Sequence, residues 1–164
     1  MTLKTILLAA AFVLPATLAL AQNAGPPPDI KTYLSSPDIQ ALIAKAKVMP
    51  PKPLISQPIV GTGAYRANLE YRAGAPAPAS IHDTENELMV VVDGSGTITT
   101  GGTLVDGTRT NPANQSGSSI AGGTPTHLVK GDMTIVPAGV PHQIAGDPAI
   151  ALMTFHVPSP WPGR

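Results

Sequence analysis

Two histidines and one glutamate have side chains of the types that bind metal ions. His82 ends a predicted strand, Glu87 follows a short polar turn, and His142 follows two tight turns later in the chain. Residues two apart on a strand share a face, so Ser80 and His82 point the same way. Imidazole and carboxylate groups together bind iron(II), manganese or zinc. The sequence therefore predicts a divalent-metal site if the strands that carry these residues meet.

The strands that would position these residues are predicted from alternation and from turn residues. After Pro53 the chain contains short β-branched runs separated by glycine, proline and aspartate. The runs are AYRANLEYRAG, ELMVVVDG, GTITTGG, THLVKGD, MTIVPAGVPH and AIALMTFHV. Several short strands at close spacing predict an all-β antiparallel sandwich or barrel. If residues 83–86 form a turn that joins two antiparallel strands, His82 and Glu87 can converge inside the barrel.

One segment among these runs is predicted to be irregular. Residues 105–124 are polar and rich in glycine, asparagine and serine. This composition predicts a long loop that covers one mouth of the barrel.

A short amphipathic helix is predicted before the strands, in SSPDIQALIAKAKVMPPKP. Ser36 is a plausible N-cap, Pro37 suits the first helical position, and Asp38 favours the positive end of the helix dipole. Apolar residues recur at helical spacing, and they are Ile39, Leu42, Ile43 and Ala46. The apolar face must pack against the barrel or against a second subunit.

The first residues predict a secretory signal peptide, because Lys4 precedes an apolar run and a small-residue cleavage site before Gln22. We therefore expect a secreted or periplasmic protein. The chain divides into a signal peptide at 1–21, a tether with the short helix at 22–53, and a barrel domain at 54–164.

Composition excludes several classes of function. The chain has no cysteine, so it has neither a thiolate nucleophile nor a thiolate metal site. Ten basic and ten acidic residues balance in the full chain, and loss of the signal peptide leaves about one negative charge. No basic patch predicts a nucleic acid or a membrane surface as a partner after signal removal.

The glycines, histidines and glutamate resemble the first motif of the cupin superfamily. That motif reads Gly, five residues, His, one residue, His, three or four residues, Glu, six residues, Gly. Here Gly74, Ser80, His82, Glu87 and Gly94 lie at those spacings, with Ser80 in the place of the first histidine.

A second cupin motif is also matched. Gly131, Pro137, Gly139 and His142 lie at its spacing, and Gly146 stands where the family has a structural asparagine. The resemblance implies a double-stranded β-helix, or jelly roll, and commonly a homodimer. It also implies that His82, Glu87 and His142 are the metal ligands.

The loss of the first motif histidine leaves the fourth ligand position open. A serine hydroxyl is a poor ligand, so a bound water beside Ser80 is one solution. His127 and His156 lie on predicted strands and are interpreted as ordinary sheet residues. Either could replace the missing imidazole if its side chain points inward, which strand register decides.

Two hypotheses for the function follow. In the first, an exported, dimeric cupin binds iron, manganese or zinc and binds or transforms a small organic molecule. Glu87 or a metal-bound water would then move a proton in an oxygenase or isomerase reaction. The residues predicted to line the pocket are Ser80, Met89, Val91 and Ile144.

In the second hypothesis the chain is a metal-free small-molecule-binding or structural cupin that has lost catalysis, and the polar residues of its barrel hydrogen-bond one another or water. The departures at Ser80 and Gly146 favour this alternative. Asp83 and Glu85 lie in the predicted turn, where we expect solvated side chains rather than catalytic ones.

Overall fold

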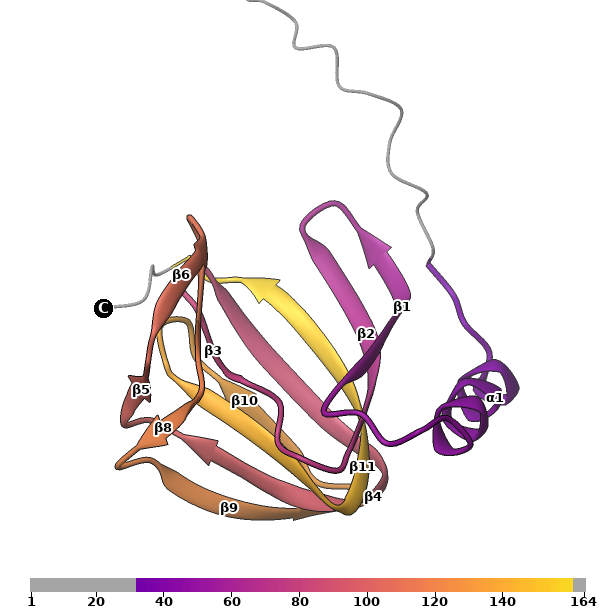
Figure 1. The fold of residues 1–164 in the computed structure, drawn as a ribbon. Helices are drawn as coiled ribbons and strands as arrows, with labels where there is room; N and C mark the ends of the chain where they lie inside the picture. Colours follow the sequence, from indigo (N-terminus) through magenta and orange to yellow (C-terminus); the bar gives the residue numbers. More distant parts are fainter. Residues whose placement is uncertain (1–31, 161–164) are drawn as a thin grey trace, which may run out of the picture.

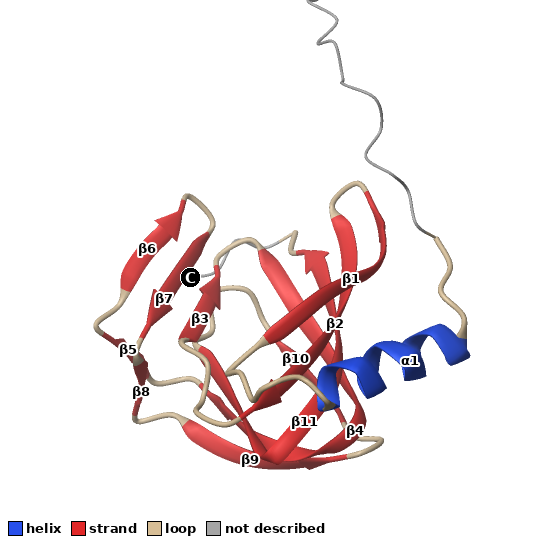
Figure 2. Ribbon diagram, turned by 45° about the vertical axis from the view of Figure 1, so that its right-hand side comes forward, coloured by secondary structure: helices blue, strands red, loops and turns tan. Residues whose placement is uncertain are grey.

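Buried and exposed side chains alternate along the two longest strands, β4 (Glu85–Thr100) and β11 (His142–Pro158). In the computed structural model, which describes residues 32–160, the buried faces of these strands line the inside of a barrel (Figure 1). The other strands are β1 (Ile55–Thr62), β2 (Tyr65–Ala73), β3 (Ala79–His82), β5 (Thr103–Val105), β6 (Thr108–Asn111), β7 (Asn114–Gly117), β8 (Ser119–Ala121), β9 (Thr124–Val129) and β10 (Met133–Val136). The predicted all-β jelly roll with one short N-terminal helix is confirmed (Figure 2).

Strand β11 connects the two sides of the barrel. The order β1-β2-β11-β3-β7-β6 runs along one side, while β4 pairs with β9, β10 and β11 on the other. All these pairings are antiparallel, and β5 and β8 form a separate two-stranded sheet. Because β11 pairs with β2, β3 and β4, its residues lie next to each strand that carries a candidate ligand.

Two apolar clusters hold the fold together. The cluster inside the barrel consists of Met89, Val91, Ile98, Leu128, Val136, Ile144, Ile150 and Leu152. The second cluster lies on the outer face of β1, β2 and β11 and contains Ile43 of the helix together with Ile59, Ala67, Leu69 and Ala151. Burying each large aliphatic side chain contributes roughly 1.5–3 kcal/mol, so both faces of this part of the sheet stabilise the fold.

Helix α1 (Ser36–Lys47) packs its apolar face on the outside of the barrel. Ser35 rather than Ser36 is its N-cap, because Ser35 keeps an extended backbone and its hydroxyl accepts the Asp38 N–H at 3.3 Å. The helix continues to Lys47, shortly before the prolines that follow it in the sequence. Within residues 32–160, no helix combines the length and the apolar character that crossing a membrane requires.

The prediction of a long loop at residues 105–124 is wrong. This segment contains β6, β7 and β8, and β7 pairs with both β3 and β6. The side chains of these short polar strands are mostly exposed or half-buried. The segment therefore lacks the apolar alternation from which strands are predicted, and backbone pairing stabilises it instead.

The turn that follows His82 joins β3 and β4, which do not pair with each other. Strand β3 pairs with β7 and β11, whereas β4 pairs with β9, β10 and β11. The turn therefore carries the chain from one side of the barrel to the other. The predicted signal peptide at 1–21 lies outside the described residues, and the boundary at residue 54 stays a prediction.

Candidate metal centre

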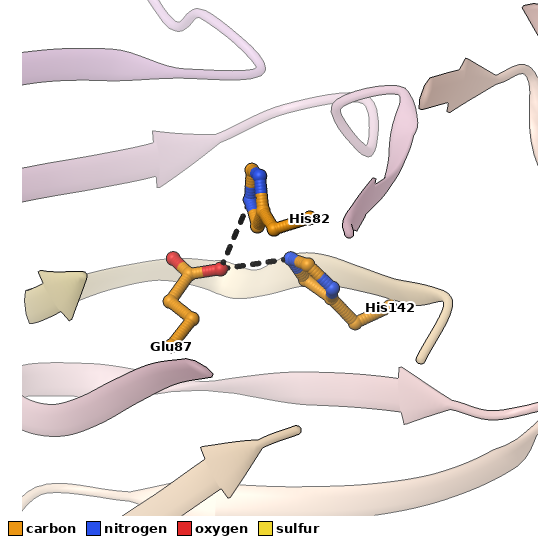
Figure 3. Close-up of side chains that lie close together, drawn as sticks. All are labelled: His82, Glu87 and His142. Atoms are coloured by element: carbon orange, nitrogen blue, oxygen red, sulfur yellow. Dashed lines mark ion pairs between the residues drawn. The ribbon is translucent and has the colours of Figure 1, made fainter. Parts of the chain in front are cut away.

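The structure brings the three predicted ligands together from three strands. His82 ends β3, Glu87 lies near the start of β4, and His142 is the first residue of β11. Glu87 Oε2 lies 2.9 Å from His142 Nε2 and 3.4 Å from His82 Nε2 (Figure 3). One ligand atom from each residue lies within 4.8 Å of the others.

Backbone hydrogen bonds of the tight turn before β11 hold this arrangement. The Gly139 N–H donates to the carbonyl of His82 at 2.8 Å, and the Ala138 N–H donates to Asn86 Oδ1 at 3.0 Å. Gly139 has φ of 79°, a left-handed conformation that glycine adopts without a steric penalty. The turn that precedes His142 is thus attached to the end of β3 and the start of β4.

Two acceptors orient the imidazoles. His82 Nδ1 lies 2.6 Å from Asn114 Oδ1, and the Asn114 amide nitrogen donates to Asn111 Oδ1, which supports this orientation of the amide. His142 Nδ1 lies 3.4 Å from the Val140 carbonyl oxygen. Because both partners are acceptors, each Nδ1 carries a proton and each Nε2 faces Glu87. Hydrogen bonds from the ring nitrogen that does not bind the metal orient metal-binding histidines in proteins.

Glu87 is ionised and buried. Only 3% of its surface is exposed. Burial by itself would raise the pKa of Glu87, but the neighbouring His142 and His82 imidazoles hold it well below its usual range. Burial likewise opposes protonation of His82, yet contacts with Glu87 and Asn114 raise its pKa. A cation must balance this carboxylate, either a proton on an imidazole or a metal ion.

The residues present fit a divalent metal. Glu87 Oε2 is buried and has no hydrogen-bond partner of good geometry, although both Nε2 atoms lie close to it. Two imidazole nitrogens and a carboxylate are a ligand set that iron(II), manganese and zinc accept.

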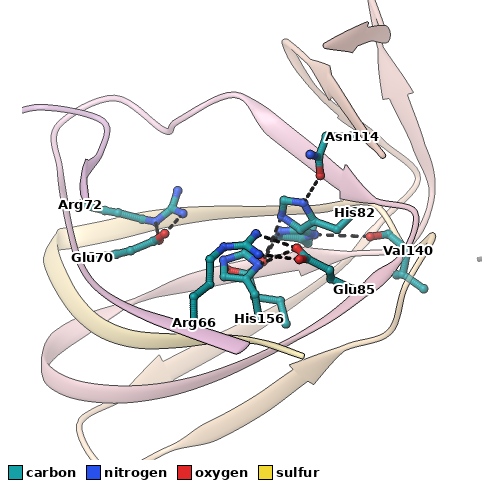
Figure 4. A network of polar contacts seen from close by, with 10 residues as sticks. Arg66, Glu70, Arg72, His82, Glu85, Asn114, Val140 and His156 are labelled. Carbon is teal, nitrogen blue, oxygen red and sulfur yellow. Dashed lines mark hydrogen bonds and ion pairs between the residues drawn. The ribbon is translucent and has the colours of Figure 1, made fainter. Parts of the chain in front are cut away.

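His156 on β11 is a further buried histidine beside these residues (Figure 4). Its Nε2 lies 3.9 Å from Glu87 Oε1, and its ring centroid lies 5.2 Å from that of His82. Burial, together with the positive charge of Arg66, lowers the pKa of His156. Of the two histidines that could have replaced the missing imidazole, His156 points inward, whereas His127 is exposed on β9.

Glu85 is not the solvated turn residue that the sequence suggested. Its carboxylate accepts two hydrogen bonds from the Arg66 guanidinium, at 2.5 and 2.7 Å, and lies 3.3 Å from His156 Nδ1. The Arg66 contacts lower the pKa of Glu85, against the effect of burial. Asp83, its neighbour in the turn, pairs with Arg109 of β6.

Sequence reasoning missed Asn114 and Arg66, because both act from strands distant in sequence. Asn114 lies opposite His82 in the β3–β7 pairing, and Arg66 lies opposite His156 in the β2–β11 pairing. An arginine within an alternating run was the only available signal for Arg66, and Asn114 was hidden in the segment interpreted as a loop.

The predicted pocket residues have different environments. Ser80 is half-buried and lies opposite His142 in the β3–β11 pairing. Met89, Val91 and Ile144 are at most 2% exposed and pack in the inner cluster. Their role in lining a ligand site stays a prediction.

A pocket of about 310 Å³ lies against β1, β2 and the end of β11. Its lining includes Val60, Ala67 and Phe155 of the outer cluster, together with Arg66 and His156. The pocket therefore borders the outer cluster and also reaches two residues beside the candidate metal centre.

Comparison with known proteins agrees with the fold. The family model described as Cupin matches residues 55–160. No curated protein matches the sequence. A solved structure from Neisseria meningitidis aligns with a TM-score of 0.50 at 12% identity, over 73% of this chain and 96% of that one.

Two further solved structures are similar. The Cnp3 cupin domain of Schizosaccharomyces pombe aligns with a TM-score of 0.50 at 15% identity, over 69% of this chain and 66% of that one. The cobalt(II) form of HppE in complex with Tris buffer aligns with a TM-score of 0.50 at 12% identity, over 68% and 58% of the two chains. Identities this low show a shared fold and nothing finer.

Proposed function

Because this chain belongs to the cupin family, we propose that it binds a divalent metal ion and, with it, binds or transforms a small organic molecule. The proposed ligands are His82, Glu87 and His142. One observation carries the proposal: a buried, ionised carboxylate faces the Nε2 atoms of two imidazoles whose Nδ1 atoms have acceptor partners.

The ligand set suits iron, manganese or zinc, and when bound such a cation supplies Lewis acidity and open coordination positions. Because contacts with His142 and His82 hold the pKa of Glu87 low, its carboxylate stays ionised and suits a metal ligand better than a proton donor. His82 is the most exposed of the three side chains, at 20% against 4% and 6%. Solvent and a small molecule would therefore reach the centre on the His82 side.

The metal-free alternative is supported by one departure from the family pattern rather than two. Gly146 has a structural reason, because a Cβ there would lie 2.5 Å from the Arg72 carbonyl oxygen and 2.7 Å from the Ala149 Cα. Ser80 remains as the departure that affects the ligand set. A metal-free barrel is therefore the outcome that would oppose the proposal.

Metal content tests the proposal. The mature protein, purified without a histidine tag, is compared with His142→Ala and with His127→Ala, which removes an exposed histidine. We expect near-stoichiometric iron, manganese or zinc in the unmodified protein and in the His127 variant, and loss of that metal in the His142 variant. Low metal content that is indifferent to His142 and is not restored by added metal would refute the proposal.

We also propose that the protein is exported and forms a homodimer. The predicted signal peptide at residues 1–21 supports export, and the family resemblance supports the dimer. N-terminal sequencing of the exported protein and light scattering of the purified protein test these two points separately.

A further inference from the structure

Three imidazoles surround Glu87, although the cupin motifs supply only two of them. We propose that His156 is the third imidazole ligand of the metal, and that Glu85 and Arg66 position it. This inference rests on the proposed metal-binding function and deepens it. It assigns the position that Ser80 leaves open to a residue outside both motifs.

The arrangement of side chains around the Glu87 carboxylate supports the proposal of three imidazole ligands. His82 and His142 approach Oε2 of Glu87, while His156 Nε2 lies 3.9 Å from Oε1. The His82 ring centroid lies 5.3 Å from that of His142 and 5.2 Å from that of His156. The three rings therefore surround one carboxylate, His82 and His142 at Oε2 and His156 at Oε1. Among the described residues, the group whose ligand atoms all lie within 4.8 Å of one another is His82, Glu87 and His142, so His156 would have to move closer to share their metal.

The curvature of β11 explains how one strand supplies two of these rings. His142 and His156 are fourteen residues apart on β11, and a straight strand of that length would separate them by about 46 Å. In the barrel both rings lie beside His82. The register of β11 against β4 is irregular between Gly146 and Ile150, where the strand bends. His156 then lies directly opposite Glu87 in the β4–β11 pairing.

The contacts at His156 Nδ1 resemble those that orient a metal-bound histidine. His156 Nδ1 is buried and lies 3.3 Å from Glu85 Oε2, without a fully formed hydrogen bond. Arg66 binds Glu85 with two hydrogen bonds and lies opposite His156 in the β2–β11 pairing. A carboxylate at Nδ1 keeps the proton there and leaves the Nε2 lone pair for a metal. Asn114 and Val140 give the other two rings the same arrangement (Figure 4).

Cobalt(II) binding tests the inference with the metal alone as the probe. Metal-stripped, tag-free protein is titrated with cobalt(II), with visible absorption as the readout. The variants are His156→Ala, His156→Gln, His142→Ala and the exposed control His127→Ala. Pulsed EPR of the copper(II)-loaded proteins then compares the number of coordinated imidazoles, which a structural role of His156 would not change.

We expect His156→Ala to bind cobalt(II) at least about 10-fold more weakly, since losing even an outer contact of a ligand costs about 10–100-fold in affinity. Its cobalt spectrum should change, and its copper form should show one coordinated imidazole fewer. His127→Ala should behave as the unmodified protein does. If His156→Ala folds poorly by circular dichroism, His156→Gln, which preserves a polar side chain in the same place, gives the same comparison.

Glu85→Gln tests the positioning part. The amide keeps an acceptor oxygen beside His156 Nδ1 but removes the charge, so we expect weaker cobalt binding with the imidazole number unchanged. Affinity equal to that of the unmodified protein would overturn the positioning role.

The two proposals fail in different ways. If His142→Ala loses cobalt while His156→Ala keeps the affinity and imidazole number of the unmodified protein, the role of His156 is overturned and the proposed function stands. If the unmodified protein binds no cobalt, both are overturned.

Discussion

Glu87 has the most restricted environment of the candidate site residues. It lies between Val136 of β10 and His156 of β11 in the sheet, so its side chain enters the barrel from a central strand. A buried charge is tolerated only when it is compensated. The surrounding imidazoles provide that compensation through a proton or a metal ion. The same environment therefore serves the stability of the metal-free barrel and the affinity for a cation.

Gly146 gives the residue-scale prediction, in which the asparagine of the family motif is restored. Gly146→Asn should destabilise the protein by about 1–3 kcal/mol, because its Cβ would be forced against the backbone of Arg72 and Ala149. Urea unfolding measures the effect. The matched control is Gly122→Asn, since Gly122 is exposed, has φ of 71° and has no atom within 4 Å of an added Cβ. Asparagine tolerates that conformation. Equal stability of the two variants would contradict this explanation of Gly146.

At the scale of elements, α1 is attached to the barrel by an apolar face and by one ion pair. Ile43 and Ala46 are buried, and Lys47 in the last turn pairs with Asp93 of β4. The pairing with Lys47 lowers the pKa of Asp93 below its ordinary value of 3.8. A carboxyl group whose pKa is lowered by folding stabilises the protein above its unfolded pKa, and the contribution is lost as the pH falls through the folded value.

The prediction at the scale of elements follows from the lowered pKa of Asp93. Lys47→Met should have a slightly lower melting temperature than the unmodified protein at pH 7, and the gap should close as the pH falls below about 4. Lys45→Met is the matched control, because Lys45 lies in the same last turn and shares any interaction with the helix dipole. The effect should be small and should shrink in high salt, since the pair is exposed. A gap that persists in acid, or one that Lys45→Met reproduces, would contradict the role of the ion pair.

At the scale of the whole molecule, the candidate ligands connect β11 to two strands that are remote from it in sequence. His82, Glu87 and His142 belong to β3, β4 and β11, and β11 pairs with both β3 and β4. A ligand that binds the folded state alone stabilises it by mass action. A metal ion bound by all three should therefore stabilise the barrel against global unfolding.

The whole-molecule prediction is a metal-dependent melting temperature. At a metal concentration of about 100 times Kd the stabilisation is about 2.7 kcal/mol, which corresponds to a rise of roughly 10 °C for a domain of this size. Differential scanning fluorimetry should show the rise with iron(II), manganese or zinc, and a chelator should reverse it. Glu87→Gln, which keeps the size of the side chain and removes the charge, should show little or no rise. An equal rise in that variant would place metal binding elsewhere.

The sequence by itself determined the class of fold and three candidate ligands. Alternating side chains and turn residues are local signals, and the spacing of Gly139 and His142, or of His82 and Glu87, lies within one turn and its flanking residues. Such signals do not depend on which strands pair. An antiparallel sandwich or barrel was predictable for that reason, whereas the jelly roll and the ligand set His82, Glu87 and His142 were implied by the resemblance to the cupin motifs.

Only the tertiary structure decided what depends on pairing between distant strands. His127 and His156 both lie on strands predicted from sequence, but the β4–β11 register places the buried His156 opposite Glu87, whereas His127 of β9 is exposed. Glu85 lies in a turn by sequence, yet Arg66 from β2 binds it. Residues 105–124 form strands because β3 provides an edge for β7. Contacts between residues far apart in sequence determine these three features, so no short stretch of the chain is enough to predict them.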